Sequence, residues 1–131
     1  MLQKSYSTTP GVTMTVLNTD GVTLPIDSLN VVWRNNTNST VLFGEWFEIQ
    51  GKENDQWKRL PIDKKYMEEG ACLTVFTAIA YILETKSQRE DIVKPWFYGK
   101  NLNRGVYRLV KTFHFDNSER QDTAFVEFEI R

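Results

Sequence analysis

The side chains in this sequence that could do chemistry are few and widely spaced. The single histidine, His114, is followed by Asp116 and Glu119. One histidine with two loop carboxylates falls short of the three or four ligands in fixed geometry that zinc requires. The loop also lacks the regular spacing of oxygen ligands in a calcium-binding loop. The sequence therefore predicts a solvated polar hairpin here, with no metal site and no cofactor.

Nucleophilic and acid–base chemistry find equally little support. Cys72 is the one cysteine, so it cannot form an internal disulfide, and between Ala71 and Leu73 we expect it to be a buried structural residue. Glu68 and Glu69 are adjacent, whereas acid–base pairs need a defined separation across a cleft. No glycine-flanked serine elbow is present. The sequence thus predicts a protein without catalytic residues, and a small enzyme remains only as the third alternative.

The aromatic side chains are a richer source of candidate binding residues. Trp46, Trp96 and Tyr98 are predicted as such, because an exposed aromatic cluster marks a carbohydrate or protein contact surface. The favoured interpretation is nevertheless that the aromatic residues belong to the hydrophobic core or its edge, and the binding surface is the alternative. The aromatic residues expected mostly inside the core are Trp33, Phe43, Phe47, Trp57, Tyr107 and Phe113.

The charge of the chain gives no reason to expect nucleic acid or an anionic membrane as a partner, because the net charge is −1. The distribution is uneven, however, with a basic segment followed by an acidic end. We interpret this as two neighbouring strands with complementary charges on their solvated faces; the alternative is a polar surface for a partner. The basic residues are Lys86, Arg89, Lys94, Lys100, Arg104, Arg108 and Lys111, and the acidic ones are Asp116, Glu119, Asp122, Glu127 and Glu129.

The 131 residues are expected to form one domain, over 11–131, after a polar N-terminal tail over 1–10. There is no apolar run long enough to span a membrane and no signal peptide. The N-terminal segment is therefore expected to be either a cytosolic start or the cut edge of a longer precursor. An isolated domain of this kind is expected to be a monomer.

Alternation of apolar and polar residues predicts the elements that position these side chains. Gly44 inside one predicted strand indicates a bulge or a close backbone approach, and 51–55 is predicted to be a hairpin turn. Residues 87–90 are predicted to be a connection, and Pro95 limits the strand that follows to an edge or a bulge. The predicted strands cover 12–17, 28–34, 40–49, 56–60, 91–97, 106–115 and 123–130.

Residues 71–86 allow two interpretations. Leu73, Phe76 and Leu83 lie at helical spacing, whereas the β-branched residues of the same segment favour a strand. We favour a strand over at least 78–83. The total of seven or eight short strands predicts an all-β, antiparallel β-sandwich with Greek-key connections.

The most informative stretch is 102–115, in which a turn leads through Gly105 into a long strand. Tyr107 follows Gly105 by two residues, which is the pattern of a tyrosine corner, where the phenol bonds backbone a few residues upstream. Gly105 and Tyr107 are therefore predicted structural residues, together with Trp33 as a core tryptophan.

With these residues in view, the chain resembles a family of bacterial immunoglobulin-like domains found in Gram-positive envelope proteins. The resemblance covers roughly 11–130. The segment before 91–97 departs from the pattern, because 84–89 lacks a Pro-Gly turn, and no lipid-attachment cysteine is present. The pieces that carry the resemblance are Gly11–Val16, Phe43–Ile49, Trp57 with Leu60-Pro61, and the motif Trp96-x-Tyr98-Gly99-x-x-Leu102-x-x-Gly105-x-Tyr107-Arg108-Leu109-Val110-Lys111.

The resemblance implies an immunoglobulin-like sandwich without catalytic residues, located outside the cell or in the cell envelope. The expected function is that of a spacer or protein-interaction module, whose partner is a protein or a cell-wall carbohydrate. The alternative is a carbohydrate-binding sandwich that uses Trp46 or Trp96 as a stacking platform.

Overall fold

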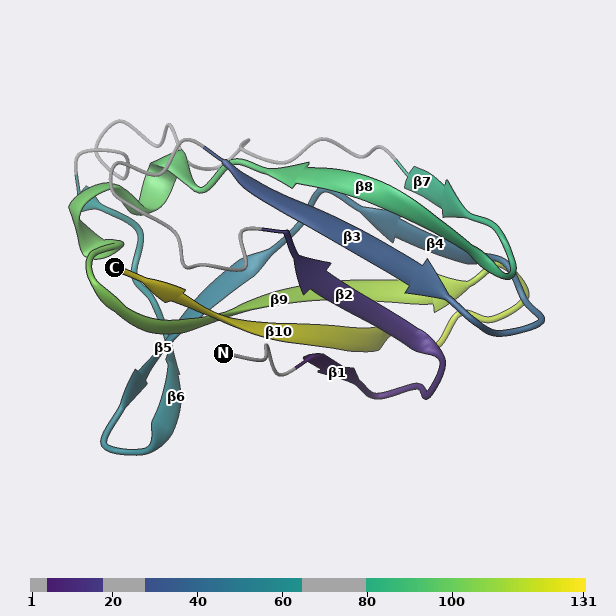
Figure 1. Cartoon of the computed structure of the whole chain (residues 1–131), viewed down its shortest axis with the longest axis horizontal. Helices are drawn as coiled ribbons and strands as arrows, with labels where there is room; N and C mark the ends of the chain where they lie inside the picture. Colours follow the sequence, from purple (N-terminus) through teal and green to yellow (C-terminus); the bar gives the residue numbers. More distant parts are fainter. Residues whose placement is uncertain (1–4, 18–27, 65–79) are drawn as a thin grey trace.

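The computed structural model describes residues 5–17, 28–64 and 80–131, and in these ranges the chain folds into two antiparallel β-sheets packed face to face (Figure 1). A short 3-10 helix, η2 (Trp96–Asn101), connects the two sheets. The strands are β1 (Ser5–Ser7), β2 (Val12–Val16), β3 (Leu29–Asn35), β4 (Val41–Gly44), β5 (Glu48–Glu53), β6 (Gln56–Arg59), β7 (Ala80–Leu83), β8 (Ser87–Val93), β9 (Gly105–Phe115) and β10 (Asp122–Ile130).

The larger sheet is organised around β9. One edge of β9 pairs with β10 along nearly its whole length, and β1 pairs with the outer edge of β10. The other edge of β9 pairs first with β5, at Tyr107–Val110, and then with β4, at Phe113–Phe115. β7 lies beyond β4, and β6 pairs with β5. The long strand predicted from the sequence is thus the central strand of this sheet.

The smaller sheet has the order β2-β3-β8. The chain crosses between the sheets from β1 to β2, from β3 to β4, from β7 to β8 and, through η2, from β8 to β9. These crossings place strands that follow each other in sequence in different layers, as in an immunoglobulin-like Greek key. The predicted fold class, an antiparallel immunoglobulin-like β-sandwich, is confirmed.

The core lies between the inner faces of the two sheets, where the side chains alternate with period two. β2 buries Val12, Met14 and Val16, while β10 buries alternate residues from Ala124 to Ile130. Trp33 is fully buried at the centre, stacked on Phe43 with ring centroids 4.7 Å apart. Burial of aromatic side chains of this size contributes strongly to the stability of a sandwich.

The N-terminal tail predicted over 1–10 needs a correction, because residues 5–7 form β1. Tyr6 lies opposite Phe125 of β10, and the two rings stack with centroids 4.9 Å apart. The Thr8 amide continues the pairing through a 2.9 Å bond to the Thr123 carbonyl. Ser5, Tyr6 and Ser7 show no alternation of buried apolar and exposed polar residues, so the sequence did not indicate this edge strand.

The strand predicted over 91–97 is also shifted. The observed strand β8 begins at Ser87, so the predicted connection over 87–90 is wrong, and β8 ends at Val93, before Pro95. Lys86 has φ of +54° in the turn that precedes β8. The Ser87 hydroxyl donates a 2.7 Å bond to the Glu84 carbonyl in that turn. The turn depends on a lysine in the left-handed region, where the usual glycine or asparagine signal is missing.

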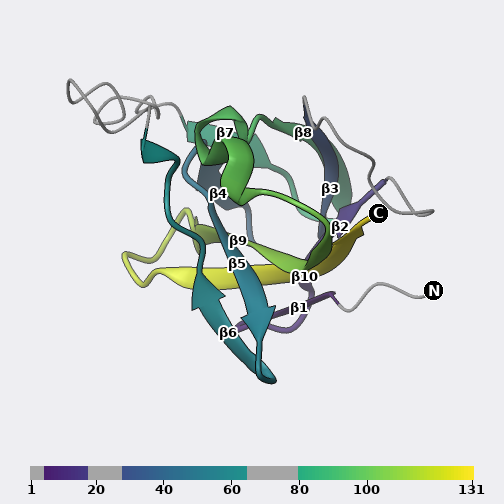
Figure 2. The same ribbon diagram turned by 90° about the vertical axis from the view of Figure 1, so that its left-hand side faces the viewer.

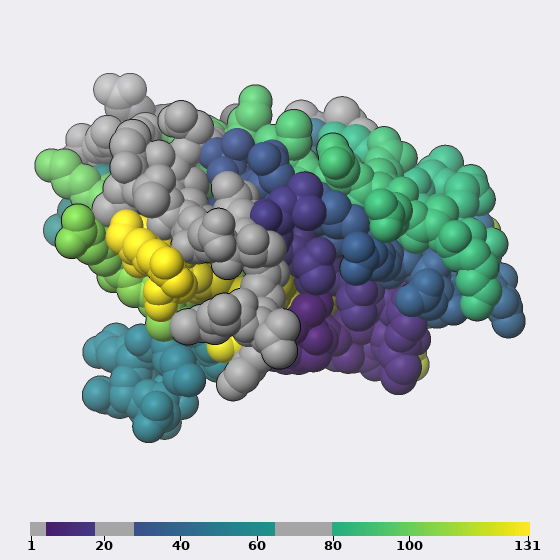
Figure 3. All heavy atoms as spheres, in the orientation of Figure 1, coloured from purple at the N-terminus to yellow at the C-terminus, as the bar shows by residue number. Residues whose placement is uncertain are grey.

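The other predicted strands within the described residues agree within one residue at each end, except the strand over 40–49. That strand is interrupted after Gly44, and its second part, β5, continues to Glu53 instead of ending at 49. β4 and β5 flank this interruption, which fits the expected bulge. The next turn is tighter than predicted: Asn54 and Asp55 have φ of +52° and +62°, and they join β5 to β6 as a two-residue hairpin. This hairpin projects from the sandwich and forms a separate lobe (Figures 2 and 3).

Of the segment 71–86, the structure describes residues 80–86. Residues 80–83 form β7, as the strand interpretation predicted; residues 71–79, Cys72 included, and the pair Glu68 and Glu69 lie outside the described residues.

The turn before β9 has the contact expected of a tyrosine corner. The Asn103 amide donates a 3.2 Å hydrogen bond to the hydroxyl of Tyr107, four residues downstream. The Tyr107 ring lies over Gly105, where an added Cβ would be 3.6 Å from the ring, and it stacks on Phe128. This contact ties the start of β9 to the connection that leads out of η2.

Candidate functional site

The three predicted binding aromatics lie in different environments. Trp46 and Trp96 are 38% and 47% exposed, whereas Tyr98 is only 3% exposed. Helix η2 turns the Tyr98 ring into the core, and its hydroxyl accepts a 3.0 Å bond from the Ile49 amide. Tyr98 is therefore a core residue, and its prediction as a surface binding residue is wrong. The apolar run Trp96-Phe97-Tyr98 could not reveal which ring a 3-10 turn buries.

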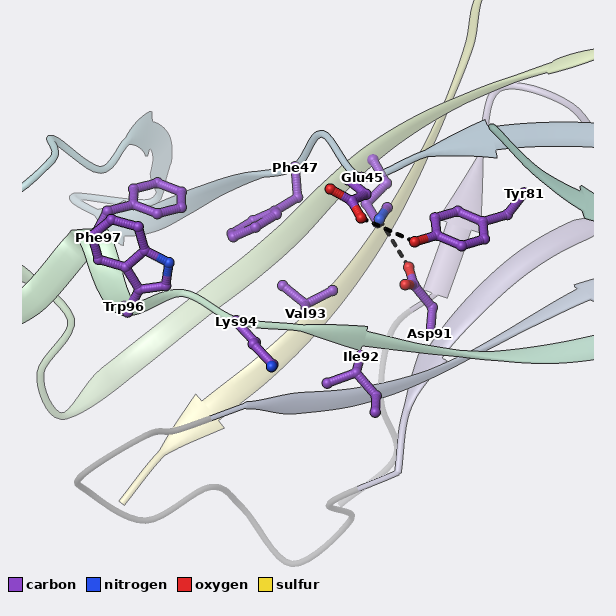
Figure 4. A pocket seen from close by; sticks show the side chains of 10 residues that line it. Glu45, Phe47, Tyr81, Asp91, Ile92, Val93, Lys94, Trp96 and Phe97 are labelled. Carbon is purple, nitrogen blue, oxygen red and sulfur yellow. Dashed lines mark hydrogen bonds and ion pairs between the residues drawn. The ribbon is translucent and has the colours of Figure 1, made fainter. Parts of the chain in front are cut away.

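A pocket of about 370 Å³ opens beside Trp96, at the margin where β8 faces the break between β4 and β5 (Figure 4). Its apolar wall is made by Phe47, Val93, Trp96 and Phe97, with Ile92 at the rim. A volume of this size falls at the lower end of the range for small-molecule sites. Trp46 does not line the pocket, so the structure does not bring the two exposed tryptophans together there.

The other end of the pocket is polar. Lys111 lies on the inner face of β9 and is 1% exposed, and its Nζ is 2.8 Å from Oδ2 of Asp91 on β8. The Trp33 indole donates a 3.3 Å bond to the same carboxylate oxygen. The Lys111 ammonium also lies 5.6 Å from the centroid of the Phe43 ring. This ion pair connects the two sheets through the core.

Lys111 had been predicted on a solvated strand face, and that prediction is wrong. Its alternation partners Leu109 and Phe113 point inward, and Lys111 must point inward with them. This period was visible in the sequence and was the one signal that could have identified the buried lysine. Asp91 lies on the edge strand β8, and no such alternation in the sequence indicated that it would pair with a buried lysine.

A second acidic group stands beside the ion pair. The Tyr81 hydroxyl donates a 3.0 Å bond to Oε1 of Glu45, and the polar ends of Glu45, Tyr81 and Asp91 converge (Figure 4). The hydrogen bond to Glu45 raises the pKa of the Tyr81 phenol, with burial and the negative charges of Glu45 and Asp91 adding to the effect. The guanidinium of Arg89 stacks 5.0 Å from the Tyr81 ring. The pocket thus contains two carboxylates, two amines (Lys94 and Lys111) and one phenol.

A different cluster covers the outer face of the larger sheet. Arg108 lies between two rings, 4.7 Å from the Phe125 centroid and 4.9 Å from that of Trp57. The Lys52 ammonium also lies over Trp57, 5.7 Å from the ring centroid, and Tyr6 stacks on Phe125. Trp57, expected in the core, is half-buried in this outer cluster because β6 extends beyond the smaller sheet. The arrangement joins β1, β10, β9 and the β5–β6 hairpin.

The hairpin around His114 is exposed. His114, Asp116 and Glu119 line a shallow surface depression, together with two neighbouring residues of the same loop. Within the described residues, no group of three or more His, Cys, Asp or Glu side chains is arranged to hold a metal ion. None of the helices in the same ranges is long and apolar enough to cross a membrane.

Comparison with known proteins gives one finding. A family model described as a bacterial Ig-like domain matches residues 8–129, which is nearly the whole chain. A search of curated proteins finds no match.

Proposed function

The chain belongs to the bacterial Ig-like domain family, and from that premise we propose that it serves as an interaction module carried on a bacterial surface or envelope protein. Membership of this family indicates a non-catalytic module. Domains of this kind are often extracellular or associated with the envelope. The choice between spacing and binding depends on how the domain presents its ends and surfaces.

The observation that carries the proposal is the direction in which the two chain ends leave the sandwich. β1 is antiparallel to β10, with Ser5 opposite Val126 and Ser7 opposite Ala124. The chain therefore enters β1 at the end of the sandwich where β10 finishes at Ile130 (Figure 1). A spacer in line with its neighbours needs its two ends at opposite poles. A domain attached at one pole projects outward, which favours display of a binding surface.

The contact surface that we propose is centred on Trp96. Ile92 is 62% exposed and lies with Trp96 at the rim of the same pocket. Exposed apolar side chains beside a concavity are typical of contact sites, and tryptophan is among the residues that most often dominate binding energy. A protein partner that inserts an apolar side chain beside Trp96 is the leading hypothesis.

A saccharide is the second candidate, because the polar groups of the pocket lie close to the exposed indole. The aromatic face of Trp96 can stack on a sugar ring, while Lys94 and Glu45 line the same pocket and can bond hydroxyl groups. The volume of about 370 Å³ limits such a ligand to a small saccharide unit.

The experiment is a binding assay of the purified domain on isolated bacterial cell walls, before and after protease treatment of the walls. Trp96→Ala is the test variant, and Trp46→Ala is the matched control, since Trp46 is similarly exposed but does not line the pocket. We expect binding that protease abolishes and that Trp96→Ala weakens at least tenfold. Protease-resistant binding that still depends on Trp96 would identify the saccharide instead. Absence of binding, or equal loss in both variants, would contradict a contact surface at Trp96.

A further inference from the structure

We propose that Lys111 and Asp91 condense after folding into an amide bond, which covalently joins β9 of one sheet to β8 of the other. The inference is independent of the proposed binding function, because it concerns the interior of the sandwich. It rests on the contact between the two side chains, on their surroundings and on a neighbouring carboxylate.

The two reacting side chains are already in contact. Nζ of Lys111 lies 2.8 Å from Oδ2 of Asp91, so the amine is in contact with the carboxyl group whose carbon it would attack. The two residues are held by strands in opposite sheets. Fixing two reactants in this way replaces a bimolecular encounter with an intramolecular step, which can accelerate a reaction by many orders of magnitude.

The environment of the pair favours loss of its charges. The Lys111 side chain is 1% exposed and that of Asp91 is 11% exposed. The Phe43 ring lies 5.6 Å from the ammonium, and the buried indole of Trp33 bonds the carboxylate. Burial of two opposite charges carries a desolvation penalty that their attraction only partly offsets. Condensation would replace both charges with a neutral amide in a site with little access for the water that would hydrolyse it.

A group that can move a proton lies in the same pocket as the pair. Glu45 lines the same pocket as Lys111 and Asp91, and its carboxylate faces Asp91 next to the Tyr81 hydroxyl (Figure 4). Glu45 and Asp91 both raise the pKa of the Tyr81 phenol, so both carboxylates act on the same hydroxyl. A carboxylate in this position can accept a proton from the amine and return it to the departing oxygen.

The reaction is balanced without any other reactant. Nζ of Lys111 forms a bond to Cγ of Asp91, and one Cγ–O bond of Asp91 breaks. Two protons of the ammonium pass to the departing oxygen, by way of Glu45, and leave with it as water. An ammonium and a carboxylate thus become one amide and one water molecule, with no oxidation or reduction and no change in net charge.

The test is intact-mass spectrometry of the purified, denatured domain, followed by fragmentation of its peptides. The expected mass is lower than the mass calculated from the sequence by one water molecule, and a branched peptide should join Lys111 to Asp91. Lys111→Arg removes the nucleophile but keeps the charge, and it should restore the full mass. Lys94→Arg is the matched control from the same pocket, and it should leave the deficit unchanged.

A second variant tests the proton transfer and covers the case in which Lys111→Arg fails to fold. Glu45→Gln should fold and should acquire the mass deficit roughly 100-fold or more slowly, as expected for loss of a general acid–base group. The full sequence mass in the folded wild-type domain would overturn the proposal and leave an ion pair only. A deficit that persists in Lys111→Arg, or forms equally fast in Glu45→Gln, would overturn the linkage or the role of Glu45 respectively.

Discussion

At the scale of single residues, the Tyr107 hydroxyl links the start of β9 to the preceding turn through the Asn103 amide. Tyr107→Phe keeps the ring stacked on Phe128 and removes only this bond. We expect a loss of about 1–2 kcal/mol in the free energy of unfolding, because the partly buried amide loses its acceptor. Urea denaturation monitored by tryptophan fluorescence measures the difference.

The matched control for this hydroxyl is Tyr6→Phe. The Tyr6 hydroxyl accepts a bond from Arg108 at the solvent-exposed surface, so its removal should change stability by no more than about 0.5 kcal/mol. Equal stability of the Tyr107→Phe variant and the wild type would show that the bond between the Asn103 amide and the Tyr107 hydroxyl does not stabilise the turn before β9.

Tyr98 provides a second prediction, for pH dependence. Burial raises the pKa of its phenol, and the bond from the Ile49 amide lowers it to a smaller extent. The folded-state pKa therefore lies above the unfolded value of about 10. The stability that comes from this group is complete below pH ~10 and is lost as the pH rises through the folded-state pKa.

The Tyr98→Phe variant should not show the part of the stability loss at alkaline pH that comes from this phenol. It should also be less stable at neutral pH by about 1–3 kcal/mol, because the buried Ile49 amide has no acceptor. Unfolding free energies at about pH 9 and about pH 11 compare the two proteins, with Tyr81→Phe removing the other raised phenol. If the free energy of unfolding decreases equally between these two pH values in the wild type and in the Tyr98→Phe variant, the alkaline decrease does not come from Tyr98.

The residues differ in how far the sequence could predict them. Trp33 and Tyr107 were predictable because each occupies a recognisable position in a strand pattern. Tyr98 was not, since its direction depends on η2, and a 3-10 turn of six residues has no distinctive periodicity. Lys111 was half-predictable: the alternation of β9 pointed it inward, but the cost of burying an ammonium argued against that direction. Only the tertiary contact with Asp91 resolves the conflict.

At the scale of elements, η2 is fixed through Asp63 to the segment that follows β6. The Lys100 amide donates a 2.9 Å bond to the Asp63 carboxylate, and the Asp63 amide donates to the Phe97 carbonyl. Gly99 lies between them with φ of +51°, and an added Cβ would be 2.9 Å from Cβ and Cγ of Asp63. The helix can therefore close only if this residue has no side chain.

Gly99→Ala should consequently destabilise the domain by at least about 2 kcal/mol, from backbone strain together with the clash against Asp63. Gly51→Ala is the control, because a Cβ there would meet the Tyr107 ring at an ordinary 3.5 Å and φ is not positive. Its stability should remain within about 0.5 kcal/mol of the wild type. Chemical denaturation of both variants makes the comparison, and equal effects would argue against the tight approach of Asp63.

The elements themselves were predictable where one face is buried and the other is solvated. β2, β3, β9 and β10 show this alternation, and their predicted bounds lie within one residue of the observed ones. β1 and the first half of β8 were missed because both lie at sheet edges, where outward-facing polar residues suffice and pairing depends on the neighbouring strand. Local pattern therefore identifies strands with an alternating buried face, the edge strand β2 included, better than edge strands that lack one.

At the scale of the whole molecule, β1 determines how the sandwich responds to tension between its two ends. Because β1 and β10 are antiparallel and the chain enters and leaves at one pole, force on Ser5 and Ile130 opens the β1–β10 pairing one residue pair at a time. The hydrogen bonds are then loaded in sequence, and each opening requires little force. The applied force reaches the strands that enclose the core only after β1 has separated from β10.

Single-molecule stretching between handles at Ser5 and Ile130 should therefore show a weak first event before the body unfolds. The length released over residues 5–11 should be roughly 25 Å, at about 3.3–3.6 Å per residue. Moving the second handle to Ser118, in the β9–β10 hairpin at the opposite pole, loads β1 and β10 in shear, so that their bonds resist together. The first event should then need a clearly higher force. Equal forces in the two geometries would contradict attachment at one pole, and with it the argument that this domain projects a binding surface instead of spacing its neighbours.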